Sequence, residues 1–156
     1  MRGTIAALLA APLASLLACG PALADDQKGA LAQFGLIGTW SSDCGKDVHQ
    51  AIASRVTFAS PPGGPETATA VDGRGADSVT TVYAITESDM PAADRIDLAL
   101  HPLTVARSDG ASAGQHEYDN VRLVFDKAGE RIRLTRVQFE GLPEIARAIV
   151  FERCAD

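Results

Sequence analysis

Apolar and polar residues alternate with a period of two along most of the chain from Leu36 onward, and this period is typical of half-buried β-strands. Turn-forming clusters rich in Pro and Gly separate the alternating segments. No segment predicts a convincing amphipathic helix, so we expect an all-β fold. The expected architecture is a single antiparallel up-and-down β-barrel of about eight or nine short strands, with a β-sandwich as the alternative. The predicted strands lie at 36–40, 52–58, 67–71, 79–85 and 96–105, in a hairpin over 116–140, and at 149–153.

The hairpin near the C-terminal end allows a specific prediction of strand register. Pairing Leu123 with Ile132 and Val121 with Leu134 places the apolar residues of both strands on one face. The turn is then the four-residue segment 126–129, a common hairpin length that contains a glycine.

The same register predicts which polar residues meet. Asp119 falls opposite Arg136 on the core-side face, and Arg122 falls opposite Arg133 on the outer face. Beyond Arg136 the apolar positions change parity by one residue, which predicts a β-bulge near Thr135.

The N-terminal segment has the layout of a secretory signal peptide. It has a basic start at Arg2, an apolar run over 5–18, and the small residues Ala22 and Ala24 before Asp25. The apolar run is too short to cross a bilayer as a helix. We therefore expect a periplasmic or secreted protein with a signal peptide at 1–24, a flexible N-terminal arm at 25–34 and a β-barrel domain at 35–156.

The three cysteines divide into one near the leader and two in the predicted barrel. The segment 16–19 resembles a bacterial lipobox, so lipidation of Cys19 and a membrane tether are the alternative to simple secretion. Cys44 and Cys154 remain, and in an oxidising compartment two such cysteines usually pair. We expect a disulfide between them, and the spacing matches no zinc-binding or redox motif.

The net charge and the sequence motifs argue against several classes of function. The chain has 20 acidic and 14 basic residues, a net charge of −6, which argues against nucleic-acid binding. No nucleophile motif or cofactor-binding loop is present, so we expect no catalysis and no cofactor. His116, Glu117 and Asp119 do not predict a metal site, because His116 and Glu117 point to opposite faces of a strand.

Gly38, Thr39 and Trp40 open the first predicted strand of this small exported chain. The triplet resembles the G-x-W motif of lipocalins and related calycin barrels. The resemblance implies that Trp40 closes one end of the barrel and that an Arg from a late strand packs on it. Arg153 is the first candidate and Arg147 the second. The resemblance also implies a cup that binds a small apolar molecule, or a filled barrel that binds protein.

We therefore expect a non-catalytic protein that binds a small hydrophobic or amphipathic ligand. The Asp119–Arg136 pair is a candidate anchor for a polar head group, or else a salt bridge at the rim. The alternative function is inhibition of a protease or lysozyme by a filled barrel, for which the acidic charge suits a basic target. The candidate ligand-binding residues are Trp40, Tyr118, Asp119, Arg136 and Phe139.

Overall fold

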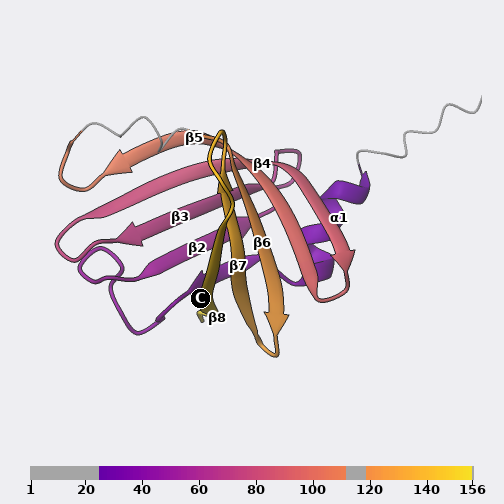
Figure 1. Ribbon diagram of the computed structural model, residues 1–156, viewed down its shortest axis with the longest axis horizontal. Coiled ribbons are helices and arrows are strands. Elements are labelled where there is room, and N and C mark those ends of the chain that lie inside the picture. The colour runs from indigo at the N-terminus through magenta and orange to yellow at the C-terminus, as the bar shows by residue number, and fades with distance from the viewer. Residues whose placement is uncertain (1–24, 112–118, 156) are drawn as a thin grey trace, which may run out of the picture.

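The computed structural model describes residues 25–111 and 119–155. The strands form a closed barrel in which each strand is antiparallel to its neighbours and β8 returns to β1 (Figure 1). This confirms the predicted up-and-down β-barrel with one disulfide and excludes the sandwich. The elements are α1 (Asp25–Phe34), β1 (Gly38–Ser41), β2 (Ser54–Ala59), β3 (Thr67–Gly73), β4 (Ser78–Ala92), β5 (Arg95–Arg107), β6 (Val121–Ala128), β7 (Arg131–Phe139) and β8 (Ile145–Arg153).

Alternation along the strands places the apolar side chains inside the barrel, as the period of two predicts. The centre is aromatic. Phe125 meets the edges of Phe58 and Phe151, with ring centroids 5.9 and 6.4 Å apart. All three rings are buried, and they fill the cross-section of the barrel between β2, β6 and β8.

Helix α1 is the element that the sequence pattern missed. The segment 25–34, expected to be a flexible arm, is helical and packs against β4 and β5 at one end of the barrel (Figure 1). Its apolar residues Ala30, Leu31 and Phe34 are buried in the core. We call this the α1 end of the barrel.

A glycine turn ends α1 and directs the chain into β1. Gly35 has a φ of +81°, and its N–H donates to the carbonyl of Ala32. The N–H of Leu36 donates to the carbonyl of Leu31, and both leucine side chains are fully buried. This is a Schellman motif with its usual apolar contact.

The predicted register of the β6–β7 hairpin is wrong. Phe125 pairs with Leu134, and the turn has only two residues, Gly129 and Glu130, in place of the predicted 126–129. Gly129 has a φ of +69°, which fits the first position of a tight hairpin turn. Near the turn, each β6 residue pairs with a β7 residue four positions further along the chain than predicted. Four is an even number, so the same side chains still face the inside of the barrel.

The predicted bulge is present, because the register shifts between Leu134 and Arg136 and leaves Thr135 unpaired. The polar pairings derived from the wrong register do not occur. Arg136 lies opposite Val124, not Asp119. Arg122 lies opposite Gln138, not Arg133.

The disulfide sits where the barrel closes. Strands β1 and β8 pair through only two residue pairs, Trp40 with Arg153 and Ser41 with Glu152. Cys44 and Cys154 follow these strands and are bonded to each other, with a Cα–Cα distance of 5.5 Å. The bridge therefore reinforces the shortest ladder of the barrel.

Strands β4 and β5 form the longest hairpin, but β5 pairs with β6 only from Arg95 to Leu100. Pro102 lies beside a register shift opposite Val82 and Tyr83, which agrees with the irregularity expected there. Among the described residues β5 has no β6 partner beyond Leu100, and the two strands separate there. Within the described ranges we find no helix with the length and apolar character needed to traverse a bilayer.

Candidate functional site

The main candidate site is a cup inside the barrel with a volume of about 430 Å³. Phe125 and Phe151 form its floor, and apolar side chains form most of its wall. The mouth opens at the end of β2 and β3 that is remote from α1, near the Ser54–Asp72 pair. The lining residues are Ser54, Arg55, Val56, Ala70, Asp72, Gly73, Arg74, Tyr83, Val121, Leu123, Phe125, Leu134, Val137, Phe139, Arg147, Ile149 and Phe151.

The cup exists because side-chain size differs along the barrel axis. At the α1 end, Phe58, Phe125 and Phe151 fill the interior. Towards the mouth, β2 and β3 present the small residues Ser54 and Ala70 on the same inward face. Small side chains leave space that the facing strands do not fill, and the volume falls within the ~300–1,000 Å³ typical of small-molecule pockets.

The α1 end is closed by a contact between Trp40 and Arg153. The Trp40 side chain is 5% exposed, and its indole N–H donates to the carbonyl of Leu36. The guanidinium of Arg153 lies over the indole ring, as the G-x-W resemblance implied. Gly38 has a φ of +120°, and a Cβ there would lie 3.7 Å from the Arg153 guanidinium carbon.

Polar side chains surround the mouth of the cup. The hydroxyl of Ser54 donates to the carboxylate of Asp72 at 2.7 Å. Arg74 follows β3 on the same face as Asp72, and Arg147 precedes the inward residues Ile149 and Phe151 on β8. The lining of the cup therefore includes the guanidinium groups of Arg55, Arg74 and Arg147 and the carboxylate of Asp72.

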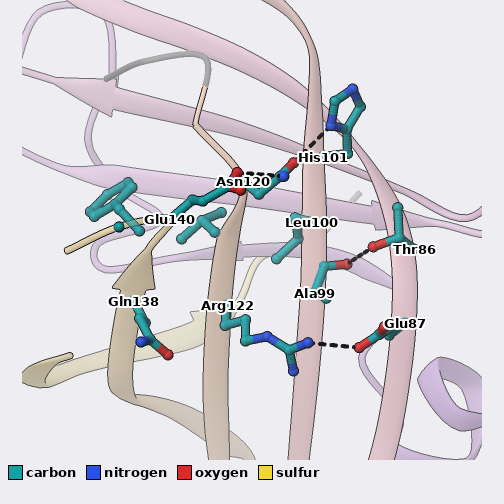
Figure 2. A pocket seen from close by; sticks show the side chains of 12 residues that line it. Thr86, Glu87, Ala99, Leu100, His101, Asn120, Arg122, Gln138 and Glu140 are labelled. Atoms are coloured by element: carbon teal, nitrogen blue, oxygen red, sulfur yellow. Dashed lines mark hydrogen bonds and ion pairs between the residues drawn. The ribbon is translucent and has the colours of Figure 1, made fainter. Parts of the chain in front are cut away.

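A second depression, of about 460 Å³, lies where β5 separates from β6 (Figure 2). Its wall is mostly polar. His101 Nδ1 lies 2.7 Å from Asn120 Oδ1, and Asn120 donates to Glu140 at 2.7 Å. On the other side Arg122 donates to Glu87 at 3.0 Å. In Figure 2 the first group links His101 of β5 to Asn120 and Glu140 at the opening, whereas Arg122 reaches past Ala99 of β5 to Glu87 of β4. We interpret both groups as ties that hold the wall together.

The predicted ligand-binding residues do not form one cluster. Phe139 lines the cup, whereas Trp40 closes the opposite end of the barrel. Arg136 is on the outer face, with half of its side chain exposed, and its partner is Glu144 at 3.7 Å. Asp119 lies half-buried just before β6, and Tyr118 is outside the described residues, as is Cys19.

Sequence reasoning also missed a contact between His49 and Ser78. His49 Nδ1 lies 2.9 Å from Ser78 Oγ, and Ser78 is 3% exposed. Asp47 accepts a hydrogen bond from the backbone N–H of His49 and not from its ring. A buried hydroxyl cannot reach a substrate, so we interpret this contact as a tie between the β1–β2 loop and β4.

An ion pair outside the cup joins β5 to β6 through Arg95 and Asp126. Arg95 Nε lies 2.7 Å from Asp126 Oδ1. This hydrogen bond lowers the pKa of Asp126, with a smaller opposing effect of desolvation, and it raises the pKa of Arg95. Over residues 25–111 and 119–155 no group of three or more His, Cys, Asp or Glu side chains is placed to hold a metal ion.

Comparisons with protein-family models, with curated proteins and with solved structures find no match to this chain.

Proposed function

We propose that the protein binds a small hydrophobic or amphipathic ligand in the cup and catalyses no reaction. The observation that carries this proposal is the cavity of about 430 Å³ with an apolar floor and wall. Burying the apolar part of a ligand there gains about 25 cal/mol for each Å² removed from water. The cavity favours this function over inhibition by a filled barrel, which has no need of internal space.

We further propose that the barrel is calycin-like. The support is the eight-stranded up-and-down topology, the Gly38-Thr39-Trp40 triplet in β1 and the Arg153 contact with Trp40. Within the described residues the helix that covers the barrel is α1, which precedes β1.

Export is the third part of the proposal. Residues 1–24 direct the chain to the periplasm or the medium, with lipidation of Cys19 as the alternative outcome. The Cys44–Cys154 bond supports export, because structural disulfides persist in oxidising compartments. The mass of the mature protein tests this part: a chain from Asp25 and a diacylated chain from Cys19 give different masses.

Binding is tested with 1-aminoanthracene, a neutral apolar dye that fluoresces when it is removed from water. We expect saturable binding to the mature protein. The variant Ala70→Phe places an aromatic ring in the cup and should abolish binding, while its Tm stays at or above that of the native protein.

Thr69→Phe is the matched control, because Thr69 neighbours Ala70 but faces outward. It should bind the dye as the native protein does. Equal binding by the native protein and by Ala70→Phe would show that the dye binds elsewhere, and would refute the proposal that the cup is the binding site. Native mass spectrometry of protein from the periplasm adds a second readout, since a carried ligand appears as mass that is lost on denaturation.

A further inference from the structure

We propose that the depression between β5 and β6 binds a guanidinium group on a short apolar stem, with Glu140 as its anionic partner. The arginine side chain of a peptide and a free alkylguanidine both present this group. The site lies outside the cup, so the inference goes beyond the proposed binding function and does not rest on it.

The charge balance of the depression leaves one carboxylate without a cation. Three charged residues line it, namely Glu87, Arg122 and Glu140. Arg122 donates to Glu87 at 3.0 Å, so these two neutralise each other. Within residues 25–111 and 119–155, the Glu140 carboxylate accepts a hydrogen bond from the neutral amide of Asn120 and takes part in no ion pair. The net charge of −6 on the whole chain also favours the approach of a cation.

The hydrogen bonds around Glu140 determine which of its atoms remain available. Nδ2 of Asn120 donates to Oε2 of Glu140, so Oδ1 of Asn120 faces His101 as an acceptor. The His101 ring therefore donates from Nδ1, and the row of three side chains ends on the carboxylate (Figure 2). The backbone N–H of Glu140 donates to the carbonyl of Asn120, which holds the residue at the rim. No described residue donates to Oε1 of Glu140, so this oxygen is open to a cationic donor.

The apolar part of the lining favours a guanidinium over an ammonium. It consists of Leu100, Val121 and Phe139, of which Leu100 and Val121 are almost fully buried. A guanidinium is planar and weakly hydrated, so it tolerates contact with apolar side chains, and its stem gains from burial against them. An ammonium is a compact, strongly hydrated charge that loses part of its hydration in the same place. The volume of about 460 Å³ is sufficient for the group and a short alkyl stem.

Gln138 supplies a second acceptor beside the carboxylate. It lies two positions before Glu140, and strand alternation directs both side chains to the outer face, about 6.6–6.8 Å apart along the strand. The fork of a guanidinium can bind the carboxylate through two parallel hydrogen bonds and direct other N–H groups towards Gln138. Because Glu140 is exposed, the ion pair alone contributes little, so binding requires the apolar stem and the second acceptor as well.

The test is an NMR titration of the mature protein with N-acetyl-arginine N-methylamide, its citrulline and lysine analogues, and butylguanidinium. The side-chain amide of Asn120 reports binding at this site, because it donates to Glu140. We expect saturable shifts with the arginine compound and none with the citrulline compound, which has a similar shape but no charge. The lysine compound should bind about threefold or more weakly. Equal affinity for butylguanidinium would identify free alkylguanidines as the ligands, whereas weaker binding of butylguanidinium would identify peptides.

Glu140→Gln removes the charge but keeps an acceptor for Asn120, so the fold should be unchanged and the affinity for the arginine compound should fall about tenfold or more. Gln138→Ala should have a smaller effect in the same direction. Glu130→Gln is the matched control, because it removes the same charge from the β6–β7 turn and should leave the affinity unaltered. Ala70→Phe, which fills the cup, should also leave it unaltered.

Several outcomes would overturn the proposal. Equal affinity for the arginine and citrulline compounds would show that charge is not recognised. Native affinity in Glu140→Gln, or an equal loss in Glu130→Gln, would overturn the role of Glu140. Loss of binding in Ala70→Phe would show that the guanidinium enters the cup instead. Failure of all four compounds to bind would overturn the site, while binding of 1-aminoanthracene would still report separately on the cup.

Discussion

The Arg153 guanidinium carbon lies 4.9 Å from the centroid of the Trp40 ring, and the same guanidinium donates hydrogen bonds to the carbonyls of Gly35 and Ile37. One side chain thus joins the last strand of the barrel to the first strand and to the turn after α1. The glycine of the triplet has its own physical reason, because any larger residue at Gly38 would have to adopt the strained φ of +120°.

Replacement of Arg153 by lysine tests this contact. A lysine keeps the charge but cannot stack flat on the indole while donating to two carbonyls. We expect Arg153→Lys to lower the free energy of unfolding in urea by about 1–2 kcal/mol, a modest value because the guanidinium is partly exposed. The control Arg133→Lys should change it little. An equal effect of both variants would show that the contact has no special role.

Loss of the disulfide should lower the free energy of unfolding by more than the replacement of Arg153 does. Cys44 and Cys154 are 110 positions apart, and cross-linking so long a loop removes much of the conformational entropy of the unfolded chain. The double variant Cys44→Ser/Cys154→Ser should lose about 4–5 kcal/mol of stability, less any strain relieved. Urea unfolding with and without a reductant measures this loss. An unchanged midpoint on reduction would contradict the prediction.

The hairpin turn between β6 and β7 depends on the backbone freedom of Gly129. Nothing lies within 4 Å of a Cβ built there, so the effect of Gly129→Ala comes from its φ of +69° alone. We expect a loss of about 1–2 kcal/mol. Gly29→Ala is the control, because Gly29 is in α1 and equally uncrowded. That variant should gain up to about 1 kcal/mol of stability from helix propensity. A lower Tm for Gly129→Ala together with a higher Tm for Gly29→Ala would support the turn geometry.

The Arg95–Asp126 pair predicts a pH dependence. The pKa of Asp126 is lower in the folded protein than its ordinary value of about 3.9 in an unfolded chain. Its ion pair therefore stabilises the fold above about pH 4, and this contribution is lost as the pH falls through the folded pKa. Asp126→Asn should lower the Tm at pH 7, and the difference from the native protein should shrink towards pH 3. A difference that is independent of pH would rule out the ionised pair as its cause.

The barrel and the disulfide were predictable because the period of two and the cysteine positions can be read from the sequence without knowing which strands pair. A period of two assigns Val121, Leu123 and Phe125 to one face whatever the partner strand does. Once Cys19 is assigned to the leader, Cys44 and Cys154 leave a single possible pairing. Arg153 could be proposed as the partner of Trp40 only through the resemblance of the triplet to a known motif.

The hairpin register was not predictable, because two registers satisfy the same parity. Pairing Leu123 with Ile132 matches two apolar residues, whereas the structure pairs Lys127 with Ile132. Lys127 is tolerated on that face because its ammonium lies over the ring of Phe34 in α1. The deciding contact thus comes from a distant helix, which the hairpin sequence does not contain.

Helix α1 and the cup were missed for different reasons. The segment 25–34 has few apolar residues, although Ala30, Leu31 and Phe34 have helical spacing and Gly35 is a recognisable stop signal. For the cup, alternation identifies the inward residues but not the volume that they leave. The empty space depends on small side chains such as Ala70 lying opposite larger ones across the barrel.

Helix α1 also determines how the barrel would be oriented at a membrane if Cys19 carries a lipid. Because α1 begins at Asp25, only residues 20–24 would separate the acylated residue from the helix, a reach of at most about 18 Å. The α1 end would then lie near the lipid head groups, and the mouth of the cup would face the aqueous phase. A ligand would have to arrive from solution or from a soluble donor, because the leaflet that holds the anchor lies behind the closed end.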